Sequence, residues 1–129
     1  MNVPENLKYT KDHEWLKVEG GAATLGITDF AQQQLTDIVF VELPAVGARA
    51  EAGKTIATVE SVKAVSDVYA PVNGEVIEIN ESLPDAPEKV NKSPYSEGWM
   101  VKIKMDDPAE ADKLMPAAEY KEFIAAESH

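Results

Sequence analysis

Lys63 is the residue in this sequence with the clearest chemical potential. It lies in the short polar segment Glu-Ser-Val-Lys-Ala, between two segments, 55–59 and 65–69, that are rich in β-branched and apolar residues. A hairpin formed by these segments would place the lysine amine near its tip, where an enzyme could join it to a carboxyl group as an amide. Because most lysines are ordinary exposed residues, position alone does not assign this function.

Other kinds of reactive site have few candidates in the chain. Cysteine is absent, which excludes disulfides, thiolate metal sites and cysteine nucleophiles. The two histidines are His13, beside Glu14, and His129 at the end, and a catalytic triad or a histidine metal site needs more than these can supply. The acidic pair at 106–107 lacks the spacing of a calcium loop, and Gly20-Gly21 does not precede a helix as a phosphate loop would. The sequence therefore predicts a non-catalytic protein without a metal site.

The residues around Lys63 resemble the lipoylation site of the H protein of the glycine cleavage system. The local resemblance includes the Glu-Ser-Val-Lys-Ala segment, Asp67, and Ala-Pro-Val-Asn-Gly-Glu-Val at 70–76. Other segments similar to that family follow in the same order: His-Glu-Trp at 13–15, Gly-Ile-Thr at 26–28, Val-Phe-Val-Glu-Leu-Pro at 39–44, Ser-Pro-Tyr at 93–95 and Gly-Trp-Met at 98–100. Together they span nearly the whole chain without a large insertion.

This resemblance implies a cofactor and a set of partner enzymes. Lipoate would be attached covalently to Lys63, and residues 1–129 would form a single lipoyl-carrier domain. The oxidised arm would receive an aminomethyl group from a pyridoxal-phosphate glycine decarboxylase. An aminomethyltransferase would pass the one-carbon unit to tetrahydrofolate, and dihydrolipoamide dehydrogenase would reoxidise the dithiol. A lipoate-attaching enzyme is the fourth implied partner. The protein itself would be a carrier in glycine catabolism and one-carbon metabolism, and the cofactor would supply the chemistry.

Four residues near Lys63 or in similar segments have expected supporting roles. Glu60 and Ser61 adjoin the lysine and are expected to be recognised by the lipoylating enzyme. Glu14 and Asp67 are expected to line a cleft for the aminomethyl-lipoyl arm, because a carboxylate would stabilise its protonated amine and a cleft would exclude water. The alternative for both carboxylates is an ordinary surface position at the end of a strand.

Several alternative functions remain open on the sequence. A lipoyl domain of a 2-oxoacid dehydrogenase acyltransferase typically has Asp-Lys-Ala, where this chain has Val62-Lys63-Ala64, and is followed by Ala/Pro-rich linkers that are absent here. A biotin carrier would resemble Met-Lys-Met, which is also absent. A protein that relays lipoyl groups to other proteins, and an unmodified binding module on the same scaffold, are further alternatives.

The elements that would position Lys63 are mostly short strands. Their close spacing predicts a mainly β fold, and the resemblance implies a barrel-sandwich hybrid of two antiparallel sheets. A short helix is expected near 28–35, and a C-terminal helix near 116–126 with Pro116 as its first helical residue. In residues 38–41 both the odd-numbered and the even-numbered positions are apolar, which predicts a strand covered on both faces. Asn73-Gly74 predicts a tight hairpin turn.

The charge of the chain limits its partners. Twelve basic and 23 acidic residues give a net charge of −11, which argues against nucleic acid and anionic membranes and favours a monomer. An acidic surface would instead favour basic patches on partner enzymes. Neither an apolar run near eighteen residues nor a basic, apolar leader is found, so a cytoplasmic, bacterial-type location is expected.

Overall fold

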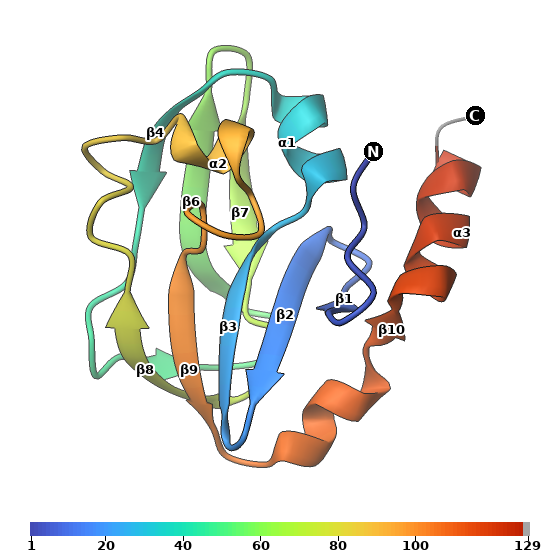
Figure 1. The fold of residues 1–129 in the computed structure, drawn as a ribbon. Helices are drawn as coiled ribbons and strands as arrows, with labels where there is room; N and C mark the ends of the chain where they lie inside the picture. The colour runs from blue at the N-terminus through green and yellow to red at the C-terminus, as the bar shows by residue number, and fades with distance from the viewer. Residues whose placement is uncertain (128–129) are drawn as a thin grey trace.

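Two antiparallel sheets form the framework of the protein (Figure 1). The structure is a computed structural model that describes residues 1–127, so His129 lies outside the described residues. The larger sheet has seven strands in the order β10 (Met115–Pro116), β1 (Lys8–Tyr9), β2 (Glu14–Glu19), β3 (Ala22–Ile27), β9 (Val101–Met105), β8 (Gly74–Ile79) and β5 (Arg49–Ala50). The smaller sheet consists of β4 (Ile38–Glu42), β6 (Thr55–Ser61) and β7 (Val65–Tyr69). The predicted mainly β fold of two antiparallel sheets is confirmed.

Cross-strand rows of apolar residues form the main core. Leu16, Leu25 and Val101 lie opposite one another on β2, β3 and β9 and are fully buried. Val41 and Val59 form a corresponding buried pair on β4 and β6. Both groups belong to one hydrophobic cluster, so the core joins the two sheets. Because side chains alternate between faces, a one-residue slip would turn these rows to solvent, and burial therefore fixes the register.

The helices are short, and α1 (Asp29–Leu35) begins as predicted. Its N-cap is Thr28, whose hydroxyl accepts a hydrogen bond from the Ala31 amide at 3.2 Å. The other helices are α2 (Lys89–Lys92), the 3₁₀ helix η1 (Pro108–Lys113) and α3 (Ala117–Glu127). Among residues 1–127, no helix is both long and apolar enough to cross a membrane.

The C-terminal helix is confirmed, but its predicted start is wrong by one residue. Pro116 belongs to β10 and pairs with Lys8, and α3 begins at Ala117. Proline is tolerated there because β10 is an edge strand that needs no further ladder donor. A second hydrophobic cluster holds α3 against β1, with the Tyr9 and Tyr120 rings stacked 4.5 Å apart.

Two predictions about the strands are wrong: the coverage of residues 38–41 and the hairpin at Asn73-Gly74. Residues 38–41 are not covered on both faces, because Val39 and Phe40 are 49% and 47% exposed. A bulge between Ile38 and Phe40 accompanies this exposure on an edge strand. The strands on either side of Asn73-Gly74 do not form a hairpin, since β7 belongs to the smaller sheet and β8 to the larger one. The lack of a side chain at Gly74 instead lets β8 and β9 approach each other closely, because a Cβ there would lie 2.2 Å from the Lys104 carbonyl oxygen.

Thr36→Gly is expected to stabilise the protein. Thr36 follows α1 with φ 62° and ψ −143°, a conformation that is costly for a β-branched residue and open to glycine. We expect the free energy of unfolding, measured by urea denaturation, to rise by about 1 kcal/mol after the chain entropy of glycine is included. Thr36→Ala retains a Cβ and is the control that should show no gain. A glycine variant less stable than the wild type would contradict this explanation.

Candidate functional site

Lys63 lies at the exposed tip of the β6–β7 hairpin (Figure 1). The two strands pair up to Glu60 and Val65, and residues 62–64 form the turn beyond that pair. Among the described residues, the Lys63 side chain makes no hydrogen bond or ion pair. Its amine is therefore accessible to another protein, as an acylation site requires.

Ser61 holds the tip in shape. Its hydroxyl oxygen accepts hydrogen bonds from the amides of Lys63 and Ala64, at 3.3 and 3.1 Å, and lies 3.2 Å from the Ala64 carbonyl oxygen. The Ser61 amide donates to that same carbonyl at 2.7 Å. The Ser61 side chain is buried and shapes the turn, and its predicted contact with a lipoylating enzyme stays a prediction. Glu60 is exposed, so its predicted recognition role stays a prediction.

The tip is also anchored to the corner between α1 and β4. The Val62 amide donates to the Asp37 carbonyl at 3.1 Å. Asn91 fixes that corner, because its side chain accepts from the Ile38 amide at 2.9 Å and donates to the Thr36 carbonyl at 2.8 Å. Sequence reasoning missed Asn91, since nothing in its local sequence indicates a contact with residues more than fifty positions away.

Glu14 connects the two sheets and is 2% exposed. Its carboxylate accepts hydrogen bonds from the Thr10 hydroxyl at 2.5 Å and from the Tyr69 amide on β7 at 3.1 Å. Burial raises the pKa of Glu14 to about 7, and the charge of Asp12 adds to this rise, although both hydrogen bonds oppose it. The Glu14 side chain thus links the two sheets, and its buried environment favours the neutral acid.

Glu14 and Asp67 differ in exposure, and their expected role in a cleft for the arm stays a prediction. Asp67 is exposed and lies opposite Thr58, whereas the next residue pair, Val59 and Ser66, has its buried valine on the core side. Because successive residues of a strand point to opposite faces, Asp67 is on the outer face of the smaller sheet. Buried Glu14 bonds instead to the backbone edge of the same strand.

A cavity of about 420 Å³ lies beside the hairpin, on the opposite side of the strand from Asp67. Ser66, three residues after Lys63, contributes to it. Its lining combines apolar groups with two carboxylates and comprises Asp12, His13, Phe30, Ala31, Gln34, Leu35, Ser66 and Glu127. The lining therefore presents apolar surface beside negative charge.

His13 organises one wall of this cavity. Its Nε2 is 2.9 Å from the Glu127 carboxylate, and its Nδ1 is 2.8 Å from the Tyr120 hydroxyl. The Tyr120 hydroxyl is also 2.7 Å from the Thr28 hydroxyl, and burial raises the pKa of this phenol. His13 has a φ of 67°, an uncommon conformation for a residue other than glycine. This network fixes the end of α3 at the cavity, which sequence reasoning did not predict.

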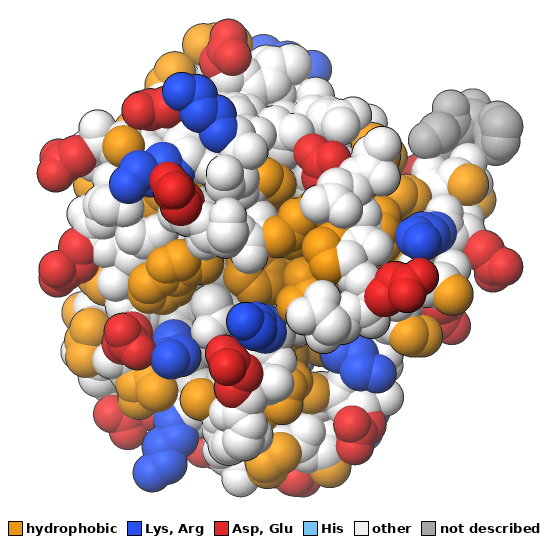
Figure 2. Space-filling view, viewed as in Figure 1, with side chains coloured by type: hydrophobic (Ala, Val, Ile, Leu, Met, Phe, Trp, Pro, Cys, Tyr) orange, Lys and Arg blue, Asp and Glu red, His pale blue; other side chains and the backbone are white. Residues whose placement is uncertain are grey.

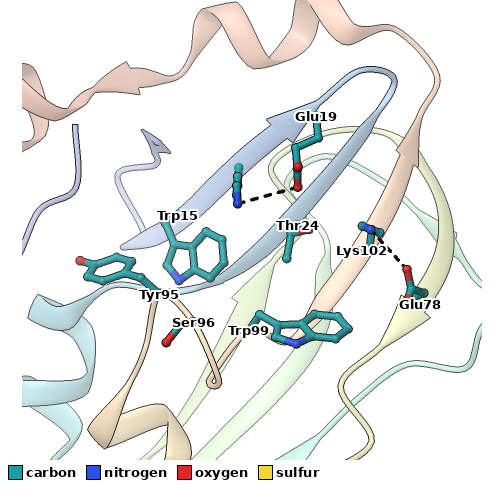
Figure 3. A pocket seen from close by; sticks show the side chains of 9 residues that line it. Trp15, Glu19, Thr24, Glu78, Tyr95, Ser96, Trp99 and Lys102 are labelled. Atoms are coloured by element: carbon teal, nitrogen blue, oxygen red, sulfur yellow. Dashed lines mark ion pairs between the residues drawn. The ribbon is translucent and has the colours of Figure 1, made fainter. Parts of the chain in front are cut away.

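A separate groove of about 330 Å³ lies on the outer face of the larger sheet (Figure 3). Trp15 and Trp99 line it beside the cross-strand row Lys17, Thr24 and Lys102. Lysines and carboxylates are interspersed on this face (Figure 2). The Trp15 indole donates to the Pro94 carbonyl at 2.9 Å. Because this groove belongs to β2, β3, β8 and β9, it is not part of the Lys63 site.

Comparisons with known proteins agree on one family. A family model described as glycine cleavage H-protein matches residues 7–127. The glycine cleavage system H protein of Staphylococcus carnosus (strain TM300) is 56% identical over 124 residues, which cover 96% of this chain and 98% of the relative. That of Anaeromyxobacter sp. (strain K) is 53% identical over 124 residues, covering 96% and 97%. The crystal structure of such a protein from Mycobacterium marinum superposes with a TM-score of 0.84 at 37% identity, covering 92% of this chain and 95% of that one.

Glu14→Gln is expected to flatten the pH dependence of stability. Because the pKa of Glu14 is raised from 4.5 to about 7 in the folded state, the folded protein binds more protons than the unfolded chain between these values. The free energy of unfolding should therefore fall as pH rises through this window, by on the order of 3 kcal/mol.

Urea titrations of both proteins at several pH values measure this effect. Glutamine can still accept from Tyr69 and cannot ionise, so the variant should gain stability relative to the wild type as pH rises from 4.5 to 7. A constant difference between the two proteins across that window would contradict the assignment.

Proposed function

Because the chain belongs to the glycine cleavage H-protein family, we propose that it is the lipoyl-bearing carrier of the glycine cleavage system, with Lys63 as the attachment residue. The observation that carries this proposal is the exposed Lys63 side chain on a turn held by Ser61 and Asp37. A rigid turn reduces the conformational entropy that an enzyme must remove when it binds this segment. The protein itself catalyses no reaction in this proposal.

The residues around Lys63 fit a lipoyl group. The amine is free to form an amide, and the neighbouring cavity offers the apolar surface of Phe30, Ala31 and Leu35 for a hydrocarbon chain. A bound lipoyl group would supply a disulfide that can take up an aminomethyl group, release it and return to the oxidised state. Because cysteine is absent, no protein thiol of this chain would compete with that group.

The proposed partners are those of glycine breakdown. A glycine decarboxylase would load the carrier, an aminomethyltransferase would unload it, and dihydrolipoamide dehydrogenase would reoxidise it. A lipoate-attaching enzyme would act first and would contact exposed Glu60 next to Lys63. We place the carrier in the cytoplasm as a monomer, because reduced dithiols persist in that compartment and the net charge of −11 opposes self-association.

The cavity beside the hairpin is the proposed resting place of the cargo. Asp12 and Glu127 would face the cationic amine, and the apolar lining would limit access of water. The role expected for Glu14 and Asp67 stays a prediction: Glu14 bonds to the Tyr69 amide, and Asp67 is exposed on the outer face. His13 would hold Glu127 in position through their 2.9 Å contact.

Lys63→Arg should abolish both modification and carrier activity. Arginine keeps the positive charge but cannot form the lipoyl amide, so the variant should retain the unmodified mass in lipoate-replete cells. The wild type should gain the mass of one lipoyl group at Lys63, and its charge should move from −11 to −12 because one cation is lost. Intact mass with a peptide map, and glycine-dependent carbon dioxide exchange, measure the two effects. Exchange supported by the arginine variant would refute the proposed function.

The double change Asp12→Asn and Glu127→Gln should shorten the lifetime of the aminomethyl cargo. Both substitutions remove a negative charge from the cavity while leaving Lys63 intact. We expect loss of cargo in buffer to accelerate by about tenfold, corresponding to about 1.4 kcal/mol of lost stabilisation. Release of ammonia from the purified loaded carrier measures this rate.

Asp85→Asn with Glu119→Gln provides the matched control, because it removes the same charges from exposed positions outside the cavity. This control should keep the wild-type lifetime. Equal lifetimes for the cavity variant and the wild type would remove Asp12 and Glu127 from the proposal.

A further inference from the structure

Exposed apolar side chains concentrate around the hairpin tip. Among residues 1–127, seven large hydrophobic residues are exposed, and four of them are Val39, Phe40, Val62 and Val65. Val62 and Val65 flank Lys63 and are 66% and 64% exposed. Single exposed apolar residues are common, but a group of them typically marks an interaction surface.

Strand pairing places these residues on a defined face. Phe40 lies opposite Glu60, and Glu60 lies opposite Val65, so the three form one row across β4, β6 and β7. All three are exposed, which assigns the row to the outer face of the smaller sheet. Lys63 lies immediately beyond this row at the end of the hairpin. An aromatic residue with aliphatic neighbours is the composition expected at the centre of a protein interface.

Carboxylates lie within and beside this row. Glu60 lies within it, and the next row on the same face is formed by Glu42, Thr58 and Asp67. Both carboxylates of this second row are exposed. Lys63 is the one basic residue within β4, β6, β7 and the tip, and acylation would remove its charge. The face therefore has an exposed carboxylate on its middle strand, with the apolar side chains of Phe40 and Val65 on either side of it.

We propose that this outer face, named here the Phe40 face and comprising Phe40, Glu60, Val65, Glu42, Thr58 and Asp67, is the docking surface for glycine decarboxylase. The surface of that enzyme would present an arginine or lysine opposite Glu60, with apolar groups on either side for Phe40 and Val65, and further basic residues opposite Glu42 and Asp67. This inference rests on the proposed carrier function, because the docked enzyme must act on a group attached to Lys63.

The Phe40 face and the cargo cavity lie on opposite sides of the same strands. Phe40, Glu60 and Val65 point outward, whereas Ser66 lines the cavity. An enzyme can therefore dock on the outer face without covering the cavity. Docking and cargo storage become separable functions of one hairpin, and each can be changed without the other.

A second copy of this chain is a less suitable occupant. Two Phe40 faces brought together would place Glu42, Glu60 and Asp67 of one molecule near the same carboxylates of the other. Like charges placed together at an interface cost free energy, and the net charge of −11 adds a longer-range repulsion. A basic enzyme surface gains from these same charges.

The test is the concentration dependence of exchange catalysed by glycine decarboxylase, with the full-length lipoylated chain as substrate. Phe40→Ser with Val65→Ser should raise the KM for the carrier at least tenfold, as expected for loss of interface anchors, and should leave kcat unchanged. The KM of the wild type should rise with salt, because screening weakens the charge attraction. Intact mass and thermal unfolding confirm that each variant is modified and folded.

Val46→Ser is the matched control, since Val46 is 60% exposed in the loop between β4 and β5. It should keep the wild-type KM to within about twofold, and Phe40→Ser with Val65→Ser should keep the wild-type cargo lifetime in buffer. An unchanged KM for the Phe40 and Val65 variant, or an equal rise for Val46→Ser, would overturn the docking proposal while leaving the carrier function intact.

Two other outcomes are equally informative. A wild-type chain that is unmodified or inactive in exchange would instead defeat the carrier function itself. A wild-type dimer in sedimentation that is lost in the Phe40 and Val65 variant would assign the face to self-association and overturn the proposed occupant.

Discussion

The alternation of side chains across the three strands of the smaller sheet governs what this molecule presents to its surroundings. Val41 and Val59 must remain in the core that joins the two sheets, and this requirement fixes the register of β4 and β6. Once the register is fixed, Phe40 and Glu60 necessarily point outward. The hairpin that carries Lys63 is the continuation of these strands, so burial in the core determines the direction in which the lysine is offered.

Local sequence signals predicted the elements whose structure is set locally. Thr28 caps α1 because its hydroxyl accepts from a nearby amide, and the helix lies where the sequence predicts it, near 28–35. Lys63 was identifiable because a short polar break between two strands has few alternatives to a hairpin. The family resemblance added the identity of the modification, which periodicity alone does not contain.

The features that the sequence did not predict depend on contacts between distant segments. Asn73-Gly74 has a hairpin composition, but the partner of each adjoining strand is decided by the packing of two sheets. The Ser61 hydroxyl bonds to the turn itself. Nothing in the local sequence of Glu14 indicates its hydrogen bond to the Tyr69 amide. The carboxylates that line the observed cavity come from the segment before β2 and the end of α3, which no local pattern connects.

The isolation of the Lys63 side chain has a thermodynamic consequence. Within residues 1–127 it forms no hydrogen bond or ion pair, and the turn beneath it is maintained by Ser61 and by the main chain. Modification of the amine therefore removes no native contact. The loss of the free amine by itself should leave the free energy of unfolding unchanged. Bare and modified chains then differ in the attached group and in the lost positive charge of Lys63, and an enzyme can distinguish them by either difference.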